Sequence, residues 1–119
     1  MAKNKLRGEL SVKVNNTTIP ALVNMNAFRL LSERYEIPLA EIDTELSDDP
    51  LNTVPKIVFC GMLNHAQRHG KPESSLPDFN QLCAFICEDE NTFTQITNEV
   101  VDTMAPDPKS GNGVEAAPK

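Results

Sequence analysis

Tryptophan is absent from this sequence of 119 residues, and the other aromatic residues are few, with one Tyr and five Phe. Proteins that hold single-stranded nucleic acid stack its bases on aromatic side chains, so this scarcity argues against a base-stacking surface. No apolar run approaches the roughly eighteen residues of a membrane-spanning helix, and no basic leader precedes an apolar stretch. These absences predict a protein that neither spans a membrane nor carries a recognisable secretion signal.

Cysteine and glycine are also sparse. The three cysteines are an odd number, which favours reduced thiols in a cytoplasm over a disulfide framework. The five glycines are scattered, so no glycine-rich phosphate-binding loop is present. The acidic cluster described below lacks the alternating Asp/Asn ligands and the glycine of a calcium loop.

Two pairs of residues could supply metal ligands, because each pair has a helical spacing of four: His65 with His69, and Cys83 with Cys87. Together they could form a Cys2His2 zinc site. However, His65 and Cys83 lie among apolar residues and the usual zinc-knuckle spacing is missing, so we expect no metal and no cofactor. Cys60 with a histidine is the only candidate nucleophile pair, and Cys60 falls in a polar stripe. We therefore expect no enzyme.

Basic residues are fewer than acidic residues: the chain has 11 Lys and Arg and 17 Asp and Glu, which gives a net charge of −6. Between residues 33 and 49, Arg34 is the only basic residue against Glu33, Glu36, Glu41, Asp43, Glu45, Asp48 and Asp49. Such a belt repels phosphate backbones, which makes nucleic acid a poor partner. A solvated helix face explains the belt most simply, and a docking surface for a basic partner is the alternative.

The N-terminal region has the pattern of a β-hairpin. Apolar and polar residues alternate from Leu10 to Val14, the period of a half-buried strand. Asn15 and Asn16 suit the turn because Asn tolerates positive φ, and residues 17–19 resume a β-favouring run. Pro20 cannot donate to a ladder, so we expect the second strand to be an edge or to end there.

Helical patterns follow. Asn24 can cap a first helix from Met25 to Glu36. Pro38 begins a short second helix, whose apolar side is formed by Leu39, Ile42 and Leu46. A third helix runs from about Leu51 or Val54 to His69, with Thr53 as its cap so that Pro55 falls in the first turn. Gly70 suits a left-handed residue at its end.

The third helix is the expected centre of the fold. It is apolar around most of its circumference, a pattern typical of a helix packed between others or against a partner. Its polar wedge consists of Lys56, Cys60, Asn64, Gln67 and Arg68. Gly61 would let another helix approach closely.

Two further helices complete the pattern. Ser75 with Asp78 predicts the start of a fourth, with Pro77 in its first turn, and Thr92 with Gln95 predicts the start of a fifth. The fourth has the inner face Phe79, Leu82, Cys83 and Ile86, and the fifth has Phe93, Ile96, Val100 and Met104 at core spacing. We predict a mainly α protein: one domain, residues 1–104, with a β-hairpin before four to five helices, and a disordered tail, residues 105–119.

The order of these elements resembles one known family. The relevant segments are a basic start, a charged strand Leu6–Leu10, Ala27–Glu33, the linker Ile37–Ile42, the long helix Ile57–Ala66, the capped segment Ser75–Phe79 and a final amphipathic helix. Over roughly residues 5–104 this layout resembles the tail assembly chaperones of long-tailed bacteriophages.

The resemblance implies a function in the host cytoplasm. Such chaperones bind the tape-measure protein, keep its apolar helical length soluble, and are displaced when tail-tube protein arrives. They tend to self-associate. For this chain we expect neither nucleic acid nor membrane as a partner, because of its acidic belt and its lack of long apolar runs. On this resemblance we expect four surplus apolar side chains to contact the partner, with core packing or self-association as the alternative: Leu30, Phe59, Leu63 and Phe85. The family also often makes a longer product by ribosomal slippage.

Two other classes of function remain open. One is another small viral interaction protein, such as a head–tail connector or an acidic inhibitor of a host nucleic-acid machine. The other is an enzyme built on the cysteine and histidine groups.

Overall fold

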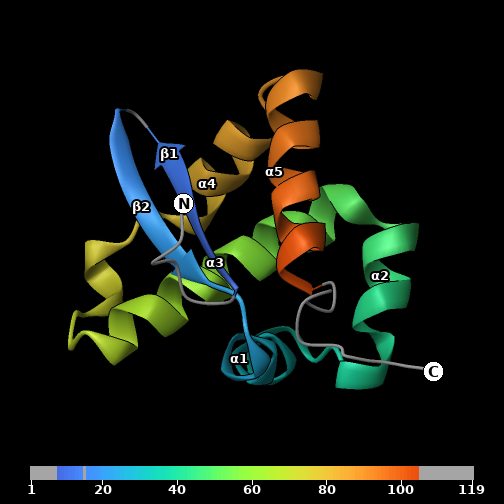
Figure 1. Cartoon of the computed structure of the whole chain (residues 1–119), viewed down its shortest axis with the longest axis horizontal. Helices are drawn as coiled ribbons and strands as arrows, with labels where there is room; N and C mark the ends of the chain where they lie inside the picture. Colours follow the sequence, from blue (N-terminus) through green and yellow to red (C-terminus); the bar gives the residue numbers. More distant parts are fainter. Residues whose placement is uncertain (1–7, 15, 105–119) are drawn as a thin grey trace, which may run out of the picture.

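The computed structural model describes residues 8–14 and 16–104. In this part of the chain a two-stranded antiparallel hairpin precedes five α-helices, and the predicted fold class is confirmed. Figure 1 shows how these elements are arranged. The elements are β1 (Glu9–Val14), β2 (Thr17–Leu22), α1 (Met25–Tyr35), the 3-10 turn η1 (Leu39–Glu41), α2 (Ile42–Asp48), α3 (Pro50–Arg68), the 3-10 turn η2 (Glu73–Ser75), α4 (Phe79–Ile86) and α5 (Glu90–Met104). The predicted tail, residues 105–119, lies outside the described residues.

The hairpin continues through its proline. We expected β2 to be an edge or to end at Pro20; it is an edge of a two-stranded sheet, and it runs on to Leu22. The amide of Val23 donates to the carbonyl oxygen of Gly8 at 2.8 Å. Because ladder bonds alternate along a strand, Pro20 then occupies a position that faces away from β1, where its missing N–H removes no ladder bond. In the predicted turn, Asn16 has a φ of 66°.

Helix α1 begins at the predicted cap. The side chain of Asn24 accepts hydrogen bonds from the amides of Asn26 and Ala27 at 3.1 and 3.2 Å. The chain then passes through η1 into α2. Ile42 is buried at the start of α2, whereas Leu39 is 54 % exposed. The inward position predicted for Leu39 is wrong, because this residue lies in the separate turn η1 and not on the inward stripe of α2.

Helix α3 begins at Pro50, one residue before Leu51, the earlier of the two predicted starts. Pro50 lies in the first turn of α3, where the backbone N–H makes no intrahelical hydrogen bond and a proline is therefore well tolerated. The proposed cap Thr53 is wrong: it is buried inside the helix, and its hydroxyl donates to the carbonyl oxygen of Glu45 at 3.1 Å. A hydroxyl can bond to an earlier backbone carbonyl as readily as it can cap.

Consequently Pro55 lies inside α3 and not in its first turn. A proline in a helix cannot donate to the carbonyl four residues earlier, which here belongs to Leu51. The thiol of Cys87, just after α4, lies 3.9 Å from that carbonyl oxygen. The neighbouring helix thus supplies a weak donor where the proline removes one.

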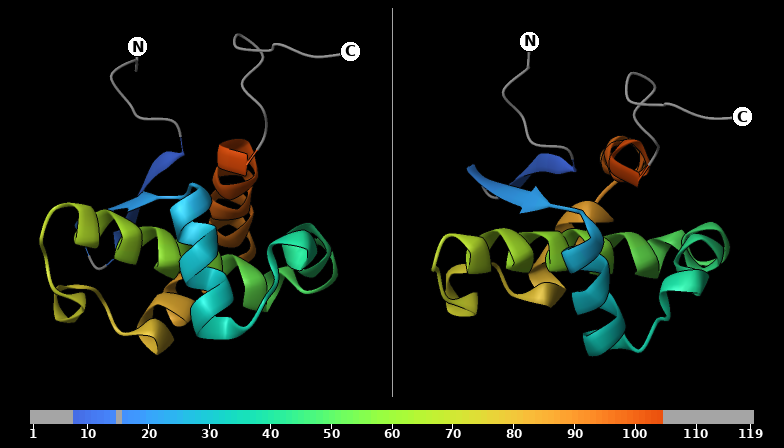
Figure 2. Two further views of the ribbon diagram at one scale, coloured as in Figure 1. Left: turned by 90° about the horizontal axis from the view of Figure 1, so that it is seen from below. Right: turned by 60° about the horizontal axis from the view of Figure 1, so that its bottom comes forward.

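Helix α3 is the most buried element, as predicted, and crosses the molecule from α2 to η2 (Figure 2). A Cβ atom on Gly61 would lie 2.9 Å from Cγ2 of Val23 and 3.2 Å from Cβ of Ala21. The close approach at Gly61 is therefore real, but the expected neighbouring helix is wrong, because the hairpin strand occupies this side. The helix ends with Gly70 at φ 69°, as predicted.

The predicted polar wedge of α3 is partly wrong. Cys60 and Asn64 are buried, with exposed fractions of 0 and 1 %. The reason is tertiary, because β2 and α1 both pack against α3. Asn64 satisfies its polar atoms through the carbonyl of Leu22 and the side chains of Asn24 and Asn26.

The start of α4 differs from the prediction. Ser75 belongs to η2 and its hydroxyl donates to the carbonyl of Pro72, so it is not the cap. Leu76 is extended, the conformation that a following proline favours. The side chain of Asp78 therefore caps α4, accepting from the amide of Asn80 at 3.0 Å.

The start of α5 also differs. The side chain of Asp89 accepts from the amide of Thr92 at 2.7 Å, and the helix begins at Glu90. Thr92 is therefore inside the first turn, and its predicted capping role is wrong. The core spacing holds for Ile96 and Val100, which are buried. Within the described residues, no helix combines the length and the apolar character needed to cross a membrane.

Candidate functional site

The structure places the predicted partner-binding residues mostly in the core. Leu30, Phe59 and Leu63 are 4, 5 and 3 % exposed and belong to the hydrophobic core. Phe85 is half-buried and packs against the same core. In this conformation the first three side chains have almost no surface to offer a partner, so core packing, the alternative explanation, describes them.

Other large apolar side chains are exposed. They are Met25, Leu51, Leu39 and Val101, with exposed fractions of 65, 59, 54 and 45 %. Sequence reasoning missed Met25, although it lies off the inward stripe of α1, which is the signal that could have identified it. It also assigned Leu39 to the inner side of a helix.

Two of these side chains line one groove. The α1–η1 groove has a volume of about 380 Å³ and is lined by Met25, Phe28, Arg29, Ser32, Glu33 and Leu39. Phe28 is half-buried and packs against the core. In the right-hand view of Figure 2, α1 and the chain leading from it to α2 lie at the lower edge of the molecule. The groove therefore combines an apolar floor with access from outside.

The rim of the α1–η1 groove is charged. Glu33 lines it and pairs with Arg29, whose Nη1 lies 3.8 Å from Oε2 of Glu33. Glu36 follows the end of α1, and Glu41 is two residues beyond Leu39; both carboxylates are exposed. Glu33 therefore brings one residue of the predicted acidic belt into the groove lining, and Glu36 and Glu41 are exposed residues of the belt that follow it closely in the chain.

Arg34, the basic residue of the acidic belt, forms an ion pair with Glu73. Both guanidinium Nη atoms of Arg34 contact the carboxylate of Glu73, at 3.0 and 3.3 Å. The guanidinium also lies 5.8 Å from the ring centroid of Phe59. These contacts join α1 to η2 and α3, so Arg34 is engaged within the fold and does not neutralise the groove rim.

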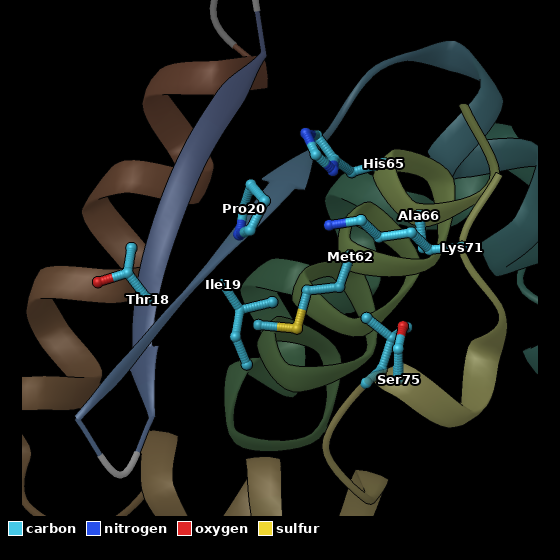
Figure 3. Close-up of a pocket in the computed structure, with 9 residues that line it drawn as sticks. Thr18, Ile19, Pro20, Met62, His65, Ala66, Lys71 and Ser75 are labelled. Carbon is cyan, nitrogen blue, oxygen red and sulfur yellow. The ribbon is translucent and has the colours of Figure 1, made fainter. Parts of the chain in front are cut away.

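A second, smaller hollow of about 170 Å³ lies between β2 and α3 (Figure 3). Ile19, Pro20, Met62, His65 and Lys71 contribute to its lining, and the figure shows Lys71 extending across it toward Pro20 on β2. Burial, followed by the positive charge of His69, lowers the pKa of His65. An imidazole in this environment is therefore biased toward its neutral form.

The structure does not bring the two candidate ligand pairs together. The rings of His65 and His69 are adjacent, with centroids 4.3 Å apart at the end of α3. Cys83 and Cys87 belong to α4 and its C-cap. Across residues 8–14 and 16–104, no group of three or more His, Cys, Asp or Glu side chains could hold a metal ion.

The candidate nucleophile is buried. Cys60 has no exposed surface, and burial raises the pKa of its thiol to about 12. Only the thiolate is a strong nucleophile, and a pKa this high leaves almost none of it at neutral pH. The position of Cys60 is thus that of a small core residue.

An aromatic cluster joins α1, α3 and α4. The ring of Phe79 lies 5.8 Å from that of Tyr35 and 5.7 Å from that of Phe59, the latter pair in edge-to-face geometry. Such pairs stabilise packing beyond the area they bury. This cluster accounts for Phe59 as a structural residue.

Comparisons of this chain with family models, with curated proteins and with solved structures find no match. Among the surfaces described, the α1–η1 groove has the exposed apolar side chains and the adjacent charge that a protein partner could use. It is therefore the candidate functional site of this molecule.

Proposed function

We propose that this protein is a bacteriophage tail assembly chaperone that binds the tape-measure protein and keeps it soluble until the tail tube polymerises. The observation that carries the proposal is the pair of exposed side chains at the α1–η1 groove, Met25 and Leu39, which are 65 and 54 % exposed. Exposed apolar surface that lies together marks sites of protein contact. The resemblance in element order over residues 5–104 supplies the identity of the partner.

The groove suits a contact that must later be released. Fully burying one large aliphatic side chain contributes about 1.5–3 kcal/mol, and association costs offset much of this. Contacts through Met25, Leu39 and part of Phe28 would therefore be individually weak. Many chaperone copies along a long apolar helical client would keep it soluble, and arriving tail-tube protein could displace them one by one. Self-association of the chaperone remains part of this proposal.

Co-expression with the tape-measure protein of the same virus tests the proposal. The wild-type chain should keep that protein soluble and co-purify with it. Met25→Ser with Leu39→Ser should weaken capture without unfolding the chain, because both side chains are exposed. Val101→Ser is the matched control, since Val101 is exposed on α5 and does not line the groove.

If the tape-measure protein stays insoluble with this chain present while a neighbouring gene product rescues it, the chaperone proposal is wrong. A connector or an acidic inhibitor would then take its place. The inhibitor has one observation in its favour, because six of the seven acidic residues of the belt are exposed: Glu33, Glu36, Glu41, Asp43, Asp48 and Asp49.

A further inference from the structure

We infer that the α1–η1 groove receives one basic amphipathic helix, whose apolar face packs on Met25, Phe28 and Leu39 and whose basic residues lie along the acidic rim. This inference rests on the proposed function for the name of the client, the tape-measure protein. The form of the occupant comes from the apolar floor of the groove and the charge of its rim.

The floor is suited to a helix face. Met25 and Phe28 are three residues apart on α1, so they lie on one side of that helix. Leu39 lines the same groove from η1. An incoming helix that places apolar residues at positions i, i+3, i+4 and i+7 can bury these side chains together.

The negative charge around the α1–η1 groove favours a positively charged helix over a negatively charged one. Glu33 and Arg29 line the groove, whereas Glu36 follows at the C-cap of α1 and Glu41 ends η1, both at exposed positions close to the lining residues in the chain. Arg29 is already directed at Glu33 and Asn26 by its guanidinium contacts. An approaching helix therefore meets excess negative charge, which attracts Lys and Arg and repels Asp and Glu.

Charge also argues against a second copy of this face. Two such grooves brought together would set these same carboxylates against each other, and like charges across an interface are unfavourable. The first seven residues of this chain form a basic segment of its own, containing Lys3, Lys5 and Arg7. The experiment must separate that segment from an external helix.

The test uses two labelled peptides of about 15 residues, roughly four helical turns. One has Leu at helical spacing with Lys elsewhere, and the other has the same Leu positions with Glu elsewhere. Fluorescence anisotropy should detect binding of the Leu/Lys peptide alone. Raising the salt concentration from about 50 to about 300 mM should weaken binding severalfold, because rim charges are screened.

Variants locate the site. Met25→Ser with Leu39→Ser should weaken binding of the Leu/Lys peptide about tenfold or more. Glu33→Gln, Glu36→Gln and Glu41→Gln together should weaken it severalfold and reduce its salt dependence. The controls Val101→Ser and Glu88→Gln with Asp102→Asn, all at exposed positions on or near α5, should bind as the wild type does.

The inference would be overturned by equal binding of the two peptides, by no binding of the Leu/Lys peptide, or by equal losses in groove and control variants. A chain lacking residues 1–7 that binds far more tightly would identify those residues as the native occupant, which also overturns it. Circular dichroism melts of each variant must match the wild type.

Co-purification with the tape-measure protein separates this inference from the proposed function. If the wild type and the groove variant retain that protein equally, the groove inference is wrong, and the chaperone activity is shown by the wild type but uses another surface. If the wild type fails to retain it while the peptide results hold, the chaperone proposal is wrong and the groove still binds basic helices.

Discussion

The buried amide of Asn64 offers a direct test of how the fold is assembled. Its Nδ2 donates to the carbonyl oxygen of Leu22 at 2.9 Å and to Oδ1 of Asn24 at 2.8 Å. Its Oδ1 accepts from Nδ2 of Asn26 at 2.7 Å. One side chain of α3 thus joins the end of β2 to the cap and first turn of α1. We expect Asn64→Asp, which keeps the shape but removes the donor, to be strongly destabilising.

The magnitude follows from the two acceptors that lose their donor. A buried carbonyl left without its partner, here that of Leu22, costs about 1–3 kcal/mol. An ionised Asp at position 64 would also face two oxygens, that of Leu22 and Oδ1 of Asn24, and this repulsion destabilises the folded state. If the carboxyl instead takes up a proton, the free energy of unfolding falls by about 1.4 kcal/mol for each unit by which its pKa is raised. Together these effects predict a loss of about 3 kcal/mol in the free energy of unfolding at neutral pH.

The loss should depend on pH in a defined direction. The surrounding oxygens raise the pKa of the new carboxyl in the folded state above its unfolded value of about 3.9. The folded variant therefore binds more protons, and its deficit relative to the wild type grows as pH rises from about 3.9 through the folded pKa. Near pH 4 a protonated carboxyl can donate to Leu22, and the deficit should shrink to about 1 kcal/mol.

Urea unfolding followed by circular dichroism, at about pH 4 and pH 7, measures these free energies. Gln67→Glu is the control, because it makes the same amide-to-carboxylate change at an exposed position of α3 and should shift stability by less than about 0.5 kcal/mol. A variant as stable as the wild type at neutral pH, or a deficit equal at both pH values, would refute the role given to Asn64.

Four further outcomes are expected. Val58→Asp should unfold the chain, because Val58 is fully buried and an unpaired charge there costs several kcal/mol, comparable with the whole free energy of folding; an unchanged circular dichroism melt would contradict this. Gly70→Ala should cost about 1 kcal/mol in urea unfolding, since the site is open but φ is 69°, and a neutral effect would argue against the left-handed helix end. Truncation after Met104 should leave the melting temperature unchanged, because residues 105–119 lack the apolar residues needed to offset ordering entropy; a large drop would show that the tail docks. Protein purified under reducing conditions should contain no stoichiometric zinc by elemental analysis, and a chelator should not change its stability.

Sequence patterns predicted correctly those features of the fold that depend on interactions between residues close together in the chain. The alternation of Leu10 to Val14, the Asn24 cap and the left-handed Gly70 were all predicted correctly, because each depends on a few neighbouring residues. The helix caps predicted for α3, α4 and α5, Thr53, Ser75 and Thr92, were wrong. Each of these regions contains several competent caps within a few residues, and those of α3 and α4 also contain prolines, so the sequence pattern did not identify the cap that is used.

The candidate site could not be located from the sequence. Phe59 and Leu63 appeared to be surplus apolar residues because α3 is apolar around most of its circumference. In the structure β2, α1, α2, α4 and α5 all pack against α3, so both of these side chains are buried. The two exposed apolar residues that line the groove are Met25, off the inward stripe of α1, and Leu39, in a 3-10 turn.

The sequence by itself determined the elements, their order and the negative charge of the segment from 33 to 49, because periodicity, capping and charge are properties of the local chain. Only the tertiary structure decided which face of each element meets another. It buried Cys60 and Asn64 on the side predicted to be polar, and it placed a strand at Gly61 where a helix was expected. It also set the apolar α1–η1 groove beside acidic residues. The physical reason is that burial depends on contacts between segments far apart in the chain, and local periodicity does not contain those contacts.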